Sequence, residues 1–267
     1  MRLLCWNVQW CRGLDGVVDP ARIAAEARRI DPDVICLQEL AANFPELEGS
    51  CGEDQPHALM HHLPQYEGCL VSGVDVPGKN GRRSRFGNLI LSRYPVGRVL
   101  RHSLPWPQSD GPSMPRVAVE AVVNAPFGPL RITTTHLEYY SAEHRAAQVE
   151  RLKELNQSRK TATEGDGPFR ALPHPESAIL CGDFNLPPGD PLHERILKIG
   201  FVDAWQALNP GKPHPNTFRV HERDEGESPY CCDYVFVTPD LAPRLRSIRV
   251  EGDNRASDHQ PVIVELA

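Results

Sequence analysis

The chain has 267 residues, of which 40% are hydrophobic and 24% charged, and its formal net charge at pH 7 is −6. This composition is ordinary for a globular protein with a large core. Nothing in it divides the chain, so we expect a single domain over residues 1–267. The negative net charge argues against a protein that coats DNA through bulk positive charge, although a local basic groove remains compatible with it.

The start of the chain lacks the pattern of a secretion signal, because residues 1–7 hold no charged region followed by a long apolar run. No stretch approaches the roughly 18 apolar residues of a membrane helix, so no membrane span is expected. The eight cysteines are too sparse for a disulfide scaffold in a chain of this length, and Cys231-Cys232 lacks the spacing of a zinc site. We therefore expect a reduced, cytoplasmic protein.

The first forty residues predict a β-α-β unit. An apolar strand at residues 3–6 is followed by a helix that begins after Asp19, where Pro20 occupies the first helical position. A second buried strand at residues 34–37 follows and ends near Glu39. Such a unit favours helices that cover a sheet.

The rest of the chain is a mixture of strands and helices. The expected strands are residues 68–72, 88–92, 96–101, 117–124, 130–135, 178–181, 234–237, 245–250 and 262–266. Helices are expected after Ser141, where apolar residues recur at helical spacing, and over residues 191–199. Residues 161–175 are polar and predict an exposed loop. Two sheets flanked by helices would accommodate this mixture.

Polar side chains directly follow several of these strands. Asn7 follows the first strand, Glu39 the second, and His136 the strand at residues 130–135. The ends of strands are where α/β sheets bind ligands. At such a place a carboxylate suits a hard cation such as Mg²⁺, and an amide can bond a phosphate oxygen. An imidazole can protonate a leaving group. Each position also has an ordinary explanation, namely a surface ion pair for Glu39, a turn for Asn7 and a structural histidine for His136.

The segment Gly182-Asp183-Phe184-Asn185 is more specific. Glycine permits a tight exit from the preceding strand. Asp183 and Asn185 are two residues apart, so on an extended segment they point to one side and present an acceptor and an amide at one place. That pair suits the binding of a water and a phosphoryl oxygen, although an Asx-type turn would produce the same pattern.

Three more polar residues flank the last strands. Asp233 precedes the strand at residues 234–237, and Asp258-His259 precedes the final strand. Asp258 could be a metal carboxylate, and His259 a general base or a stabiliser of the pentacovalent phosphorus if Asp233 supports its imidazole. Neighbours on an extended chain point apart, so Asp258 and His259 require a bend or two distinct roles. The sequence has no nucleophile elbow, P-loop or GxGxxG segment.

These motifs, in their order along the chain, resemble those of the endonuclease/exonuclease/phosphatase family of Mg²⁺-dependent phosphoesterases. That family includes pancreatic-type deoxyribonuclease and abasic-site endonucleases. The matching stretches are Trp6-Asn7, Leu37-Gln38-Glu39, Gly87-Asn88 with Leu91-Ser92, Thr135-His136-Leu137, Gly182-Asp183-Phe184-Asn185, Asp233-Tyr234 and Ser257-Asp258-His259. The resemblance implies an α/β fold, a four-layer α-β-β-α sandwich with two mixed β-sheets packed face to face. It also implies in-line attack of water on phosphorus, with Mg²⁺, or Mn²⁺ in its place, as cofactor.

The resemblance further implies a role for each site residue. The expected metal-binding residues are Glu39, Asn7 and Asp258. The expected catalytic residues are His259, Asp233, Asp183, Asn185 and His136. Among these, Asp183 and Asn185 would orient water and phosphate, Asp233 and His259 would form a hydrogen-bonded dyad, and His136 would donate to the phosphate.

Two positions depart from the family pattern. Some branches carry an acid two residues after the first asparagine, where this chain has Gln9. The difference weighs against a second metal site at that end but not against activity, since other branches lack the acid too. Cys232 precedes Asp233 where many members have an aliphatic residue, and we expect a packing role for it.

The core motifs do not indicate which of the family's substrates this chain takes. That choice must therefore depend on residues in the loops. The candidate substrate-binding residues are Asn88, Arg82, Arg83, Arg85 and Trp106. The basic loop at residues 79–85 could hold a flanking phosphate, and the tryptophan could stack on a base. A solvated hairpin tip and a tryptophan packed on the core would fit equally well.

Three functions remain open on this basis. The first is a Mg²⁺-dependent phosphodiesterase or nuclease that acts on nucleic acid or a nucleotide-like ester. The second is a phosphomonoesterase, or a phosphodiesterase of lipid headgroups such as sphingomyelin or inositol phosphates. The third is a catalytically silent binding module, and the complete set of motif residues argues against it. A phosphoester substrate is the expected partner, and no obligate protein partner is evident.

Overall fold

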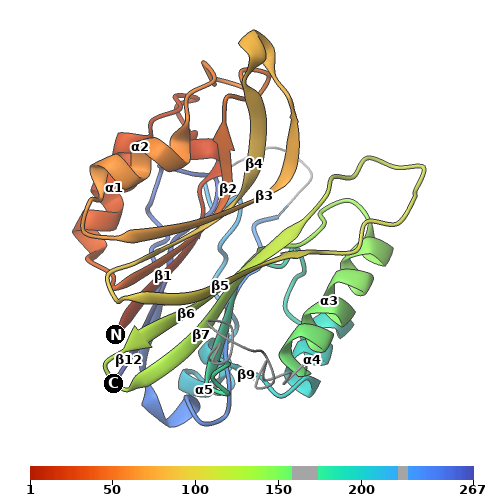
Figure 1. Cartoon of the computed structure of the whole chain (residues 1–267). Helices are drawn as coiled ribbons and strands as arrows, with labels where there is room; N and C mark the ends of the chain where they lie inside the picture. The colour runs from red at the N-terminus through yellow and green to blue at the C-terminus, as the bar shows by residue number, and fades with distance from the viewer. Residues whose placement is uncertain (158–173, 222–227) are drawn as a thin grey trace, which may run out of the picture.

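The computed structural model describes residues 1–157, 174–221 and 228–267 and contains two six-stranded β-sheets packed face to face (Figure 1). The strands of the first sheet are β1 (Arg2–Asn7), β2 (Val34–Ala42), β3 (Glu67–Pro77), β4 (Arg83–Ser92), β11 (Leu245–Val250) and β12 (Val262–Leu266). Their order in space is β11-β12-β1-β2-β4-β3. Only β1 and β2 run parallel within this order, so the sheet is mixed.

The second sheet is also mixed. Its strands are β5 (Val96–Ser103), β6 (Val117–Ala125), β7 (Gly128–His136), β8 (Ala178–Asp183), β9 (Val202–Asp203) and β10 (Asp233–Val237). They lie in the order β5-β6-β7-β8-β10-β9, with a parallel pair at β7 and β8.

Helices form the outer layers. Those described are α1 (Pro20–Ile30), α2 (Gln55–His62), α3 (Ala142–Gln157), α4 (Pro191–Lys198) and the short α5 (Ala204–Leu208). Helices α1 and α2 cover the first sheet, and α3 and α4 cover the second (Figure 1). The α/β class and the four-layer sandwich expected from the sequence are therefore confirmed. Within the described residues, no helix has both the length and the apolar character needed to cross a membrane.

The central strands are buried on both faces, which explains why they appear as unbroken apolar runs in the sequence. In β1, Leu3 and Cys5 belong to the core between the sheets, while Leu4 and Trp6 pack with the residues of α1. Successive side chains of a strand point to opposite faces, so one strand contributes to two cores. Asn7 has the parity of Cys5 and therefore faces the second sheet.

Several elements differ from the sequence prediction. Strand β2 does not end near Glu39 but continues to Ala42, and β3 and β4 are longer than expected, so that Arg83 and Arg85 lie on a strand and not in a loop. Helix α2 was not expected, because its apolar residues form no clear stripe. Helix α1 begins as predicted, since the Asp19 side chain accepts from the Ala21 amide. Of the loop expected at 161–175, residues 161–173 lie outside the described residues.

A buried polar cluster holds the start of α5. Asp203 Oδ1 accepts from the backbone amides of Trp205 and Gln206, and Oδ2 lies 2.8 Å from Nε2 of both His193 and His214. Burial acts to raise the pKa of Asp203, but the hydrogen bonds from the two histidines outweigh it and lower this pKa to about 2. The carboxylate thus ties α4, α5 and the segment after α5 together.

We expect Asp203→Asn to lower the free energy of unfolding by about 2 kcal/mol at pH 7. The folded-state pKa of about 2 lies below the unfolded value of about 3.9, so the ionised carboxylate stabilises the fold above pH 4 and loses this effect between about pH 4 and pH 2. Urea unfolding of both proteins at pH 7 and pH 3 measures the difference. An equal difference at both pH values would contradict the assignment.

Candidate active site

Four predicted site residues lie at strand ends and face the space between the sheets. Asn7 ends β1, His136 ends β7, Asp183 ends β8 and Asp233 begins β10. Each continues the alternation that places side chains such as Cys5 in the core between the sheets. In the second sheet, His136 and Asp233 stand opposite Asp183 on its two neighbouring strands. The fold therefore brings these side chains together at one end of the sandwich.

Asn7 joins the two sheets through its side-chain amide. Its Nδ2 donates to Asp183 Oδ2 and to Glu39 Oε1, each at 3.0 Å, and its Oδ1 accepts from the Gln9 backbone amide at 3.1 Å. All three contacts fix the orientation of the amide group. Asn7 therefore holds two carboxylates of different sheets beside each other.

Glu39 reaches the site because β2 contains a β-bulge. Leu37 pairs with Leu89 and Leu40 with Gly87, so two residues of β2 stand opposite one residue of β4. Glu39 lies in this bulge with a φ of 60°. Without the extra residue, alternation along the strand would turn Glu39 toward the helices, as it turns Leu37. The bulge directs the carboxylate to Asn7 instead.

Glu39 and Asp258 fit the predicted metal. Burial raises the pKa of Glu39 to about 7, and the negative charge of Asp258 adds to this rise. Carboxylate oxygens are the ligands that Mg²⁺ prefers, and a divalent cation held by both groups would offset the burial and the repulsion. Asn7 turns its amide nitrogen toward Glu39 and its oxygen toward the Gln9 backbone amide, so it orients the Glu39 carboxylate. Its role as a metal ligand stays a prediction.

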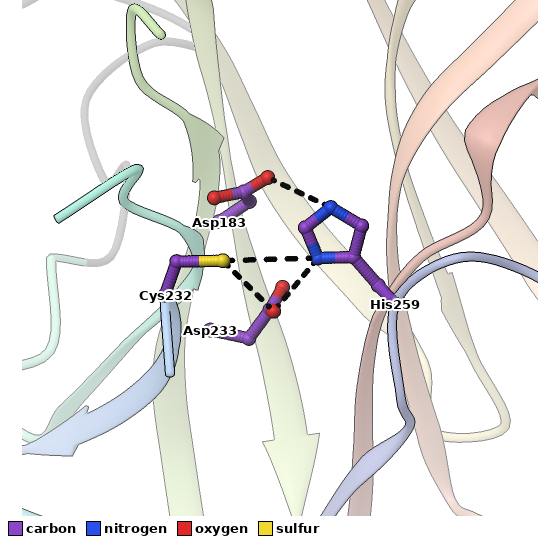
Figure 2. A group of neighbouring side chains, drawn as sticks. All are labelled: Asp183, Cys232, Asp233 and His259. Atoms are coloured by element: carbon purple, nitrogen blue, oxygen red, sulfur yellow. Dashed lines mark hydrogen bonds and ion pairs between the residues drawn. The ribbon is translucent and has the colours of Figure 1, made fainter. Parts of the chain in front are cut away.

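His259 and Asp233 form a buried pair, as Figure 2 shows. His259 Nδ1 donates to Asp233 Oδ2 at 2.8 Å, and Nε2 lies 3.6 Å from Asp183 Oδ2. Burial acts to lower the pKa of His259, but the charges of Asp233 and Asp183 outweigh it and raise the pKa well above its usual value. The chain bends at residues 256–258, and both Asp258 and His259 line one cavity. The bend thus lets two neighbouring residues face the same cavity.

Cys232 lies closer to this pair than a packing role requires. Its Sγ is 3.5 Å from Asp233 Oδ2 and 3.9 Å from His259 Nδ1 (Figure 2). The ligand atoms of Asp183, Cys232, Asp233 and His259 all lie within 4.8 Å of one another, as a metal site would require. A thiol and an imidazole suit a softer metal than Mg²⁺, and the dyad already uses Nδ1. The oxygen donors Glu39 and Asp258 therefore fit the predicted Mg²⁺ better than this group does.

His136 and Asn185 form the other side of the site. Asn185 Nδ2 donates to Leu137 O at 2.9 Å and lies 3.0 Å from His136 Nε2, which is 3.4 Å from Asp183 Oδ2. Burial, aided by the positive charge of Arg116, lowers the pKa of His136 well below its usual value, so the ring is neutral at pH 7. The Asn185 backbone amide also donates to Asp183 Oδ1, so the Asx turn and the site coexist.

Three supporting residues were not predicted. Gln38 Nε2 donates to Thr134 Oγ1 of the opposite sheet at 2.8 Å, beneath the site. Thr217 Oγ1 accepts from the backbone amides of Cys232 and Asp233, and the Phe218 ring lies 4.5 Å from the His259 ring. Gln38 stands beside Glu39 and could have been found by its position. Thr217 and Phe218 follow no predicted strand, so the sequence held no signal for them.

A cavity of about 440 Å³ lies over these residues. Its polar wall contains Glu39, His136, Asp183, Asn185, Asp258 and His259. Its remaining wall is formed by Trp10, Phe44, Leu47, Val74, Phe86, Met114, Tyr139, Tyr140 and Phe218, with Gln9 and Arg116. A wider depression of about 930 Å³ lies between α1 and residues 250–256, but it contains none of the predicted catalytic residues. The smaller cavity is therefore the candidate active site.

The predicted substrate-binding residues do not line this cavity. Asn88 is buried, and its Nδ2 donates to Val117 O at 3.0 Å. Arg83 donates to the side chain and backbone of Asp75. Trp106 is 52% exposed and donates to Ser113 in its own loop. A role of these residues, and of Arg82 and Arg85, in substrate binding stays a prediction.

Comparisons with known proteins agree with this geometry. The model of the Endonuclease/Exonuclease/phosphatase family matches residues 4–259. Among solved structures, an endonuclease/exonuclease/phosphatase from Beutenbergia cavernae is 26% identical, with a TM-score of 0.74 over 100% of this chain and 72% of the other. A mannosyl-6-phosphatase from Bacteroides thetaiotaomicron (19% identity, TM-score 0.69, coverage 100% and 99%) has a similar fold.

An AP endonuclease from Archaeoglobus fulgidus has the same fold as well, with 18% identity and a TM-score of 0.63 over 100% of this chain and 99% of the other. No curated protein matches the sequence. The family match spans the motifs from the first strand to His259, and thus every predicted metal-binding and catalytic residue. The chain belongs to the endonuclease/exonuclease/phosphatase family.

Proposed function

We propose that the protein is a divalent-metal-dependent phosphodiesterase that hydrolyses a nucleic acid or a nucleotide-like ester by attack of water on phosphorus. The observation that carries the proposal is the content of one cavity. It joins two carboxylates suited to Mg²⁺ or Mn²⁺ with the Asp183–Asn185 pair and with His259, whose imidazole is held by Asp233. Membership of a family of hydrolytic phosphoesterases supports the same conclusion.

Asp183 is the group that we propose accepts the proton of the attacking water. Burial raises its pKa to about 6, near the value at which a general base works best at neutral pH. The Asn7 side chain donates to its Oδ2 and the Asn185 backbone amide to its Oδ1, so the carboxylate cannot rotate freely. The orientation leaves it between the two histidines of the site.

His259 is assigned the stabilisation of charge on a phosphoryl oxygen. The sequence left this role and that of general base open. The raised pKa favours the imidazolium form, which cannot accept a proton, and Asp233 holds the ring with Nε2 toward Asp183 and the cavity. A fixed positive group aimed at developing negative charge lowers the barrier. A cation at Glu39 and Asp258 would supply further polarisation of the phosphoryl group when bound.

A phosphomonoesterase with the same site is the second candidate. The fold that this chain shares with a mannosyl-6-phosphatase is the observation that favours it. Monoesters and diesters differ in the charge of the phosphoryl group, so rates with p-nitrophenyl phosphate and its diester would separate the two. A lipid-headgroup phosphodiesterase would use the same residues, and the complete set of catalytic groups argues against a silent binding module.

Purified protein is expected to hydrolyse bis-p-nitrophenyl phosphate with Mg²⁺ or Mn²⁺, and EDTA is expected to abolish the reaction. The reason is that Glu39 and Asp258 offer oxygen ligands and the remaining groups cannot neutralise the phosphoryl charge alone. Release of p-nitrophenolate measures the rate, and added Mg²⁺ in excess of EDTA should restore it. Protein that stays inert toward monoesters and diesters with every divalent metal would overturn the proposal.

A further inference from the structure

Much of the outer wall of the active-site cavity is apolar and aromatic, although the site is expected to bind phosphate. Trp10 comes from the segment after β1, and Tyr139 and Tyr140 come from the segment after β7, so segments that follow strands of both sheets contribute to the wall. Tyr140 is 64% exposed and Tyr139 39% exposed. Aromatic rings left uncovered beside a cavity are typical of a binding surface.

Few cations accompany these rings. Arg116 is the one arginine or lysine among the described residues that line the cavity, and it is paired with the buried carboxylate of Glu138 at 3.5 Å. The basic hairpin between β3 and β4 is partly neutralised as well, since Lys79 pairs with Glu46 and Arg83 with Asp75. A strand of nucleic acid would require a row of free positive charges for its flanking phosphates. The structure offers no such row at the cavity within the described residues.

The aromatic wall is held in place by a buried network. Glu138 accepts from the backbone amide of Tyr140 at 3.0 Å and from that of Met114 at 3.3 Å. Arg145 of α3 donates to the backbone oxygens of Glu138 and Tyr139. The tyrosine rings themselves meet edge to face, with centroids 5.0 Å apart. Exposed rings on a braced backbone lose little freedom on binding, which favours stacking.

The part of the wall around Trp10, in the segment after β1, is both braced and strained. Trp10 Nε1 donates to Glu48 O at 2.9 Å. Gln9, Trp10 and Cys11 have φ values of 44°, 41° and 60°, a left-handed conformation that residues with side chains rarely adopt in succession. Strain of this kind persists where the surrounding structure enforces it, and it is concentrated at functional sites.

We infer that the cavity takes a small phosphodiester whose retained ester group, the one that is not the leaving group, carries a flat ring, either an aryl group or a nucleobase, that stacks on the aromatic wall. This inference rests on the proposed function and names the substrate class of the same site. The ring would lie between the segments that carry Trp10 and Tyr140, while the phosphoryl group would face Asp183 and His259. Flanking phosphates would contribute little.

Four diesters with the same p-nitrophenyl leaving group test the inference, because only the second ester group differs. The second group is methyl, hexyl, phenyl or the 5′-position of thymidine. We expect kcat/KM for the phenyl or the thymidine ester to exceed that for the methyl ester by roughly tenfold or more. The difference should appear mainly in KM, because stacking on one ring strengthens substrate binding by about this factor. The better of the two identifies the source of the ring.

Variants show whether the wall is responsible. Tyr140→Ala should remove most of this preference, whereas Tyr140→Phe should keep it because the ring remains. Val17→Ala removes an exposed apolar side chain away from the cavity and should match the wild type. Each variant is first compared with the wild type by circular dichroism and thermal unfolding.

The other outcomes are distinct. Equal kcat/KM for the methyl ester and for the phenyl and thymidine esters would overturn the inference while the proposed function stands. A hexyl ester that matches or exceeds the phenyl ester would replace ring recognition by general apolar binding. A single-stranded oligonucleotide cleaved in clear preference to the thymidine ester would show that flanking phosphates are bound. Absence of hydrolysis of all four esters with Mg²⁺ and Mn²⁺ would overturn the proposed function together with the inference.

Discussion

Replacement of His259 by alanine is expected to lower kcat for bis-p-nitrophenyl phosphate by about 10²–10⁴-fold. The imidazole donates to Asp233 at 2.8 Å, and its Nε2 lies 3.6 Å from Asp183 beside the cavity. Alanine removes the positive group proposed to stabilise the phosphoryl oxygens, and Arg116, the one arginine among the described lining residues, is already paired with Glu138. KM should change less, because the charge develops mainly in the transition state.

Two further variants show whether this loss is specific. Asp233→Asn keeps the shape of the side chain but removes the charge that raises the pKa of His259, so it should also impair turnover while the fold stays intact. His61→Ala removes an exposed imidazole on α2, outside the cavity, and should leave kcat unchanged. Near-normal turnover in His259→Ala would show that the dyad is misassigned. Unfolding of Asp233→Asn would show that Asp233 is structural first.

The second large effect is expected at Gly182, where alanine should destabilise the fold by more than about 3 kcal/mol. Gly182 has a φ of 141°, and a Cβ there would lie 1.9 Å from the backbone oxygen of Thr135 on the neighbouring strand. Both the conformation and the clash oppose any side chain. Since His136 and Asp183 follow these two residues directly, β7 and β8 cannot separate without displacing the site.

Urea unfolding measures this effect, and two glycines serve as matched controls. Gly128 in β7 has a φ of 118°, but a Cβ added there would meet no atom within 4 Å, so Gly128→Ala reports the conformational cost alone, about 1–2 kcal/mol. Gly111 has neither restriction, and Gly111→Ala should be nearly neutral. Equal stability of Gly182→Ala and Gly128→Ala would mean that the close approach of β7 and β8 can relax.

Much of the fold could be predicted from local signals. The helix after Asp19 begins where the capping residue and Pro20 place it. The central strands were found because burial on both faces makes them continuous apolar runs. The boundaries of the strands were less predictable. The long hairpin of β3 and β4 includes Arg83 and Arg85, and these polar residues are extended because they pair with a neighbouring strand.

The sequence also placed most of the candidate site, for a simple reason. Asn7, His136, Asp183 and Asp233 sit at the ends of apolar strands, and alternation along each strand already directs them between the sheets. For Cys232 the sequence predicts only a packing role, because its distance from the Asp233 carboxylate depends on the pairing of β10 with β8 and on Thr217, which is distant from both strands in sequence.

By itself, then, the sequence determined the class of fold, the strand ends that carry the polar side chains and the family to which the chain belongs, because these depend on local periodicity and on motif order. The tertiary structure decided how those side chains meet. The bulge in β2 turns Glu39 inward, and the bend before His259 lets both Asp258 and His259 face the cavity. Pairing with Asp75 neutralises Arg83 of the hairpin, and the braced segments around Trp10 and Tyr140 contribute the aromatic rings of the cavity wall. Register, bulges and long-range pairs arise only when distant segments pack together, which no local pattern records.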